Sequence, residues 1–161
     1  MFLHAGWLHL IGNMWALYIF GDNVEDRLGP LRYLLFYLVA GTVAALTQSF
    51  MSAGSRLPLV GASGAIAGVL AAYLVLFPGA RVLTLILIII IPLFIEIPAL
   101  FFILFWFATQ FFAGVTSLSG AAASQGGVAY WAHIGGFFTG LLLVLLFARR
   151  PSAVYRLNPE R

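Results

Sequence analysis

Long apolar segments, each ended by charged or helix-breaking residues, restrict this chain more than any other feature of its sequence. The chain is 63% hydrophobic and only 8% charged, whereas a soluble domain carries about 25% charged residues. Segments of about 20 apolar residues match the thickness of the hydrocarbon core of a bilayer. The sequence therefore predicts an all-α membrane protein with five transmembrane helices. We expect these spans over residues 5–20, 31–51, 61–78, 98–112 and 128–148.

The arginines predict how the spans are oriented. The chain has eight arginines and no lysine, and arginines collect in the cytoplasmic loops of membrane proteins. If the polar tail of residues 149–161 is cytoplasmic, five spans leave only Arg56 on the outer side. A sixth span over residues 82–97 would break this pattern. We therefore expect residues 1–148 to form one transmembrane domain, in which residues 82–91 are an extended or interfacial connector.

Composition also limits the chemistry of the chain. No basic run carries interleaved aromatic residues, so nothing indicates binding to nucleic acid. The chain has no cysteine and three histidines, which excludes disulfides and thiolate metal sites. We expect no metal and no cofactor.

A stripe of small residues follows one serine in the third segment. On a helix, Ser63, Gly64 and Gly68 share one face with Ala67 and Ala71, at about 100° per residue. The Gly64–Gly68 spacing is the small-xxx-small pattern of close contacts between membrane helices. The hydroxyl of Ser63 has two interpretations: it bonds back to its own helix, or it does chemistry.

A second stripe lies in the last segment, where His133, Gly136 and Gly140 fall within about 60° of one another on a helix. Packing one stripe on the other would bring Ser63 and His133 within hydrogen-bond reach. A serine becomes a nucleophile when a base takes its proton, and imidazole is the usual base. The alternative is that His133 bonds a backbone carbonyl of a neighbouring helix.

Two polar residues of the first segment, His9 and Asn13, face the same way because they are spaced i, i+4. Side-chain N–H donors directed at one point suit the negative charge that develops when a carbonyl is attacked. A metal pair is a poorer interpretation because no third ligand is evident, and a polar contact between helices is a third. His4 lies on a different face, and we expect it to be a structural or interfacial residue rather than a catalytic one.

These motifs resemble those of the rhomboid intramembrane serine proteases. The matching pieces are His4-x4-His9-x3-Asn13, Gly61-Ala62-Ser63-Gly64 with Gly68, and Ala132-His133-x2-Gly136-x3-Gly140. They occur in the order of the family, across nearly the whole chain. The resemblance implies a rhomboid-like helical bundle in which Gly61, Gly64, Gly68, Gly136 and Gly140 serve close packing.

The resemblance also implies roles for the polar residues. Ser63 would be the nucleophile and His133 the general base, and His9, Asn13 and the Ser63 backbone N–H would form the oxyanion hole. The segment of residues 98–112 and the loop of residues 113–127 would be the mobile helix and the lid of the family.

The chain departs from the family pattern in two ways. The family core has six spans, and we expect the first of them to be absent from this chain. Some members carry an aromatic residue four positions after the nucleophile, stacked on the histidine, but this chain has Ala67 there. Another group must therefore orient His133.

The sequence thus predicts an intramembrane serine endopeptidase that cleaves transmembrane or membrane-anchored proteins through an acyl-enzyme. The alternative is a catalytically impaired rhomboid-like protein that binds or escorts transmembrane clients. A small transporter subunit fits less well, because the polar residues gather at one depth and do not line a path across the bilayer. We expect a bacterial plasma membrane, with the C-terminus in the cytoplasm.

Overall fold

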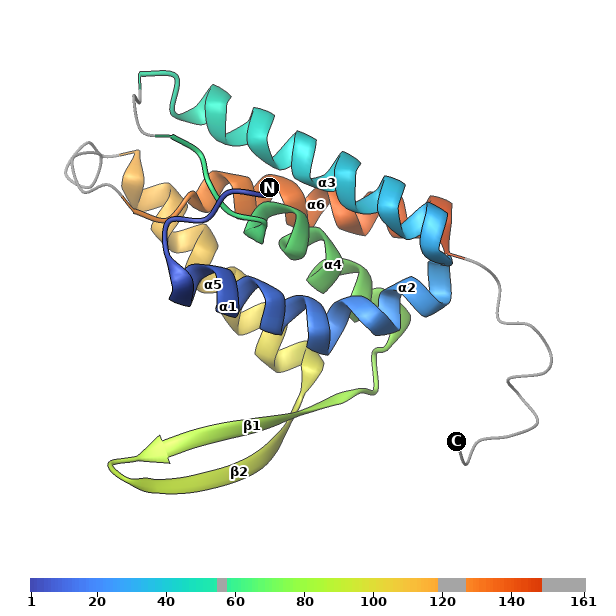
Figure 1. Cartoon of the computed structure of the whole chain (residues 1–161), viewed down its shortest axis with the longest axis vertical. Helices are drawn as coiled ribbons and strands as arrows, with labels where there is room; N and C mark the ends of the chain where they lie inside the picture. Colours follow the sequence, from blue (N-terminus) through green and yellow to red (C-terminus); the bar gives the residue numbers. More distant parts are fainter. Residues whose placement is uncertain (55–57, 119–126, 149–161) are drawn as a thin grey trace.

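The structure is a bundle of helices with one projecting hairpin (Figure 1). This computed structural model describes residues 1–54, 58–118 and 127–148. Its elements are α1 (Trp7–Ala16), the π-helical turn η1 (Leu17–Gly21), α2 (Asp22–Leu28), α3 (Pro30–Met51), α4 (Ser63–Leu76), β1 (Arg81–Ile88), β2 (Ile91–Pro98), α5 (Ala99–Ser117) and α6 (Tyr130–Phe147). The predicted class, a helical membrane protein, is confirmed.

Three helices in the described ranges are long and apolar enough to cross a membrane, namely α3, α5 and α6. The helix α4 is also apolar but has 14 residues, which at 1.5 Å per residue is shorter than the hydrocarbon core. The count of five spans therefore stays a prediction.

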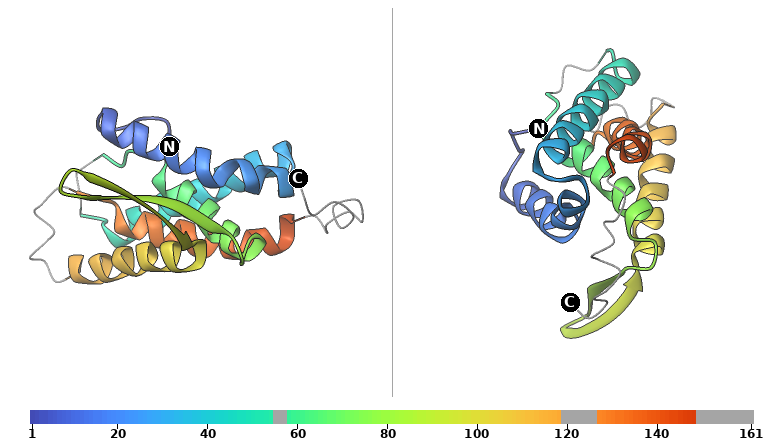
Figure 2. Two further views of the ribbon diagram at one scale, coloured as in Figure 1. Left: turned by 90° about the horizontal axis from the view of Figure 1, so that it is seen from below. Right: turned by 90° about the vertical axis from the view of Figure 1, so that its right-hand side faces the viewer.

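The helix α4 lies at the centre of the bundle, side by side with α3 and α6 (Figures 1 and 2). Every residue from Gly64 to Tyr73 is buried, which explains why α4 is apolar on all sides. Large buried side chains of the surrounding helices complete the core. Phe36 of α3, Ile103 of α5 and Val144 of α6 are all fully buried.

The first apolar segment continues further than its sequence indicates. We expected it to end at residues 21–23, but helical backbone runs on through η1 and α2 to Leu28. The reason is burial, because Val24 and Leu28 are both inaccessible to solvent, while the charged residues between them stay partly or fully exposed. Gly29, with φ of 83°, ends this helix, and Pro30 opens α3 at its first position.

The helix α5 also exceeds its expected end near residue 112, since it runs to Ser117. Gly114 is buried, and a Cβ placed on it would lie 3.0 Å from the Ile134 side chain of α6. This contact keeps the last turn of α5 on the bundle. The expected loop over residues 113–127 is wrong for residues 113–117, which are helical. Residues 119–126 lie outside the described part of the chain, and the lid role of the segment stays a prediction.

The expected extended connector is confirmed as the first strand of an antiparallel hairpin. In the register of β1 and β2, Arg81 is opposite Pro98 and Ile88 is opposite Ile91. Near the base, Arg81 Nε lies 3.2 Å from Glu96 Oε2. Large apolar side chains along both strands are exposed, and Figure 2 shows the hairpin standing clear of the helices.

Candidate active site

The site is built on a seam where the backbones of α4 and α6 touch. A Cβ on Gly140 would lie 2.5 Å from the Cα of Gly68, and a Cβ on Gly68 would lie 3.0 Å from the Gly136 carbonyl oxygen. A Cβ on Gly136 would lie 2.8 Å from the Gly64 carbonyl carbon. Glycine is therefore required on both helices, and the two predicted stripes do face each other.

Ser63 and His133 meet at one end of this seam. Ser63 is the first residue of α4, and His133 lies in the first turn of α6. The Ser63 Oγ is 2.7 Å from His133 Nε2, a normal hydrogen-bond length. His133 is only 5% exposed, so the imidazole is largely withdrawn from solvent, whereas Ser63 is partly exposed. The alternatives were a bond from Ser63 to its own helix and a bond from His133 to a backbone carbonyl. The structure instead has a contact between the two side chains.

The other ring nitrogen of His133 contacts a residue that sequence reasoning did not place. His133 Nδ1 lies 2.7 Å from Gln110 Oε1 of α5. The ring of Trp106, one turn earlier on α5, lies beside the imidazole with 5.5 Å between centroids and a tilt of 41°. Ala67 contributes no ring, so α5 supplies the contacts that orient His133. The sequence does contain one sign of this role, since Gln110 is the one amide side chain in the apolar helix α5. Polar groups in membrane spans usually have a function.

Of the two residues predicted for an oxyanion hole, His9 lies near Ser63, whereas Asn13 makes a bond within its own helix. The ring of His9 lies against Gly61, where a Cβ would be 2.7 Å from His9 Nε2 and 3.7 Å from Ser63 Oγ. Gly61 has φ of +109°, so glycine is needed there for conformation and for space. Asn13 is buried, and its Nδ2 donates to the His9 carbonyl of its own helix at 2.9 Å.

The Ser63 backbone N–H is a third donor in this region. It belongs to the first residue of α4, and the first N–H groups of a helix have no carbonyl partner within that helix. The first intrahelical bond of α4 runs from the Ile66 N–H to the Ala62 carbonyl at 3.0 Å. The N–H groups of α4 before Ile66 therefore have no carbonyl partner within the helix.

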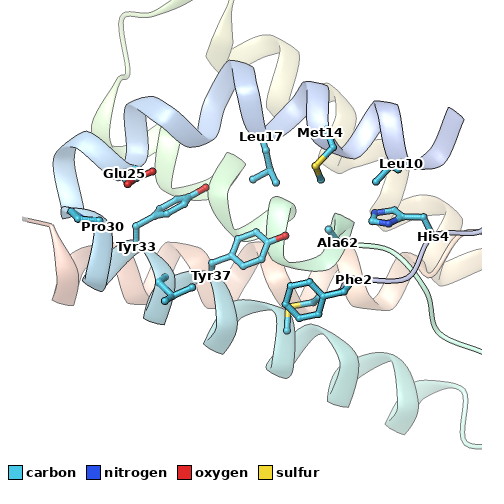
Figure 3. A pocket seen from close by; sticks show the side chains of 12 residues that line it. Phe2, His4, Leu10, Met14, Leu17, Glu25, Pro30, Tyr33, Tyr37 and Ala62 are labelled. Atoms are coloured by element: carbon cyan, nitrogen blue, oxygen red, sulfur yellow. The ribbon is translucent and has the colours of Figure 1, made fainter. Parts of the chain in front are cut away.

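Two cavities adjoin this end of α4. The smaller, about 90 Å³, is lined by Ser63 itself together with Gly61, Gly64 and Ala132; one water occupies about 30 Å³, so it has room for water beside the hydroxyl. The larger, about 530 Å³, lies between α1 and α3 and does not reach Ser63. Figure 3 shows its lining, which includes Met14 of α1 and the rings of Tyr33 and Tyr37 of α3.

His4 also lines the larger cavity. Its ring packs edge-on against His9 with centroids 5.2 Å apart, which agrees with a structural position. In the described ranges, no three His, Cys, Asp or Glu side chains gather closely enough to hold a metal ion.

The apolar helices around this Ser–His pair define an integral membrane protein of the helical class. A family model described as the rhomboid domain matches residues 1–150. The chain belongs to the rhomboid family.

Curated relatives include proteins of plants, yeast and bacteria. Rhomboid-like protein 11, chloroplastic, of Arabidopsis thaliana is 32% identical over 152 residues, covering 94% of this chain and 52% of the relative. Rhomboid protein 1, mitochondrial, of Saccharomyces cerevisiae is 31% identical over 145 residues, covering 88% of this chain and 38% of the relative. A protein of Bacillus subtilis named as a candidate rhomboid protease is 36% identical over 72 residues, covering 45% of this chain and 36% of the relative.

This chain spans about half the length of the chloroplast relative and less of the others. No solved structure gives a significant match.

Proposed function

We propose that this protein is an intramembrane serine endopeptidase that cleaves transmembrane or membrane-anchored proteins through a Ser63–His133 dyad. The observation that carries the proposal is the 2.7 Å contact between Ser63 Oγ and His133 Nε2. A serine hydrogen-bonded to an imidazole is the arrangement that activates a hydroxyl for attack on a carbonyl. The name of the Bacillus subtilis relative supports the same activity.

The proposed reaction is acyl transfer in two halves. His133 Nε2 takes the hydroxyl proton as Ser63 Oγ attacks the carbonyl carbon of a peptide bond. The imidazolium then gives this proton to the departing amine, which leaves an ester between Ser63 and the substrate. In the second half, water attacks the ester with His133 again acting as base, and the carboxylate product and the Ser63 hydroxyl are released.

Negative charge on the attacked carbonyl oxygen needs nearby donors. The Ser63 N–H and the His9 ring are candidates by position. Asn13 would have to exchange its 2.9 Å bond to the His9 carbonyl for one to the substrate. We therefore propose that Asn13 joins the oxyanion hole only when substrate is bound.

The proposed orientation of the protein rests on the distribution of its arginines. With the C-terminus in the cytoplasm, the Ser63 end of α4 faces the outer side, as the distribution of arginines favours. Transmembrane segments that unwind near that side are the proposed substrates. The bacterial plasma membrane stays a prediction, since the relatives come from several kinds of organism.

The test is labelling of the purified protein in detergent with a fluorophosphonate probe, which reacts with activated serines. We expect the parent to be labelled and both Ser63→Ala and His133→Ala to lose labelling. The inactive variants must keep the thermal transition of the parent, so that loss of labelling reports chemistry and not unfolding.

If the folded parent is not labelled and does not cleave a transmembrane substrate in liposomes, the endopeptidase proposal is wrong. Co-purification of an intact transmembrane client with that inactive parent would then favour the client-binding alternative. If His133→Ala is still labelled, Ser63 is a reactive serine, but His133 is not the base that activates it.

A further inference from the structure

We propose that Gln110 is the positioning residue that fixes the tautomer of His133, so that Nε2 is free to accept the Ser63 proton. Its consequence for the rate rests on the proposed function, whereas its effect on the tautomer does not. The starting observation is that the two ring nitrogens of His133 have different partners. Nε2 faces Ser63 Oγ and Nδ1 faces Gln110 Oε1, each at 2.7 Å.

The orientation of the Gln110 amide is set by its neighbour on α5. Thr109 Oγ1 donates its only hydrogen to the Trp106 carbonyl at 2.6 Å. Its lone pairs therefore remain to accept from Gln110 Nε2, which lies 3.0 Å away. With the NH₂ group held by the threonine, the amide oxygen is the atom that faces His133.

An amide oxygen can only accept a hydrogen bond. The proton of a neutral imidazole must therefore be on Nδ1, where it is donated to Gln110, and the lone pair is left on Nε2. A reversed amide would present an N–H to Nδ1 and put the proton on Nε2, which would leave Ser63 without a base. The other partner of a histidine nitrogen commonly selects the tautomer in this way.

Gln110 and Trp106 lie one turn apart on α5 and contact the same ring. Trp106 covers part of the imidazole at 5.5 Å between centroids, which limits its rotation, while Gln110 fixes its protonation. These two contacts take the place of the aromatic residue that Ala67 does not supply.

The direct test is NMR of the protein labelled with ¹⁵N in its histidines, in which protonated and unprotonated ring nitrogens have well-separated shifts. The His133 signals are identified by their absence in His133→Ala. We expect Nδ1 to be protonated in the parent and in Gln110→Glu, which keeps an acceptor of the same length. In Gln110→Leu we expect the signals to move toward a mixture of tautomers.

Thr109→Val tests the origin of the amide orientation, and it should shift the His133 signals in the same direction. Thr42→Val is the matched control, because Thr42 of α3 makes the same kind of bond to its own helix, 2.8 Å to the Leu38 carbonyl. This control should leave the His133 signals unchanged. Unchanged signals in Gln110→Leu would overturn the proposal, whether or not the protein is a protease.

Kinetics provide the second readout. We expect Gln110→Leu to lower kcat about 10- to 100-fold, the usual effect of losing a group that orients a functional histidine, with KM changed less than about twofold. Gln110→Glu should recover most of kcat. A loss confined to KM, or an equal loss in Gln110→Glu, would overturn the positioning role. If the parent itself lacks activity, the proposed function fails and the NMR result still decides the tautomer.

Discussion

Adding one methyl group at Gly136 should separate the dyad. A Cβ there would lie 2.8 Å from the Gly64 carbonyl carbon, and closer still to the carbonyl oxygen, whereas ordinary contacts begin near 3.4 Å. The obstacle is backbone, which cannot rotate aside, so α4 and α6 must move apart by at least about 0.6 Å, the difference between these distances. The same displacement would stretch the 2.7 Å contact between Ser63 Oγ and His133 Nε2 to the limit of a useful hydrogen bond.

We therefore expect Gly136→Ala to lower the rate of fluorophosphonate labelling roughly 10- to 100-fold, since a misplacement of about 1 Å costs about 100-fold. Overpacking should also destabilise the bundle by about 1–3 kcal/mol, so a thermal transition in detergent must accompany the assay. Gly12→Ala is the matched control, because Gly12 is also helical but a Cβ there meets nothing within 4 Å. If folded Gly136→Ala reacts at the parental rate, the seam does not set the geometry of the dyad.

Two further variants test other parts of the structure. His9→Ala should lower the labelling rate about 100- to 1,000-fold, the effect of removing one oxyanion donor, while the thermal transition stays within a few degrees; an unchanged rate would leave His9 outside the oxyanion hole. Phe36→Ala should reduce stability by about 3–5 kcal/mol because the ring is fully buried, measured as a lower transition temperature, and a transition equal to that of the parent would contradict its place in the core.

Helical periodicity was sufficient to predict that Ser63 and His133 lie together. Each residue stands at the end of a glycine stripe, and packing one stripe on the other with both helices pointing the same way brings these ends together. The catalytic roles of these residues stay predictions. The approach of His9 to Gly61 could be anticipated only through the family resemblance, because η1, α2 and α3 lie between them in the chain.

Other features depend on tertiary contacts that the local sequence pattern does not predict. Gln110 reaches His133 across 23 positions of sequence, and nothing in its own helix indicates the partner. The continuation of helix to Leu28 depends on burial of Val24 and Leu28, whereas hydropathy alone interprets their charged neighbours as a polar turn. The last turn of α5 likewise depends on the contact of Gly114 with α6.

The site has two parts, and we expect them to respond differently to the surrounding lipid. One is the Ser63–His133 pair on the seam of α4 and α6, and the other is Gln110 on α5. Ser63 and His133 are held by backbone in contact with backbone, which lateral pressure or bilayer thickness can hardly alter. Gln110 is held by side chains of α5, whose outer face carries exposed residues such as Phe105 and Phe112. We expect a change of acyl-chain length to tilt α5 and alter the orientation of the imidazole before it separates the serine from the histidine. Membrane composition would then change the rate of the proposed reaction while Ser63 and His133 stay in contact.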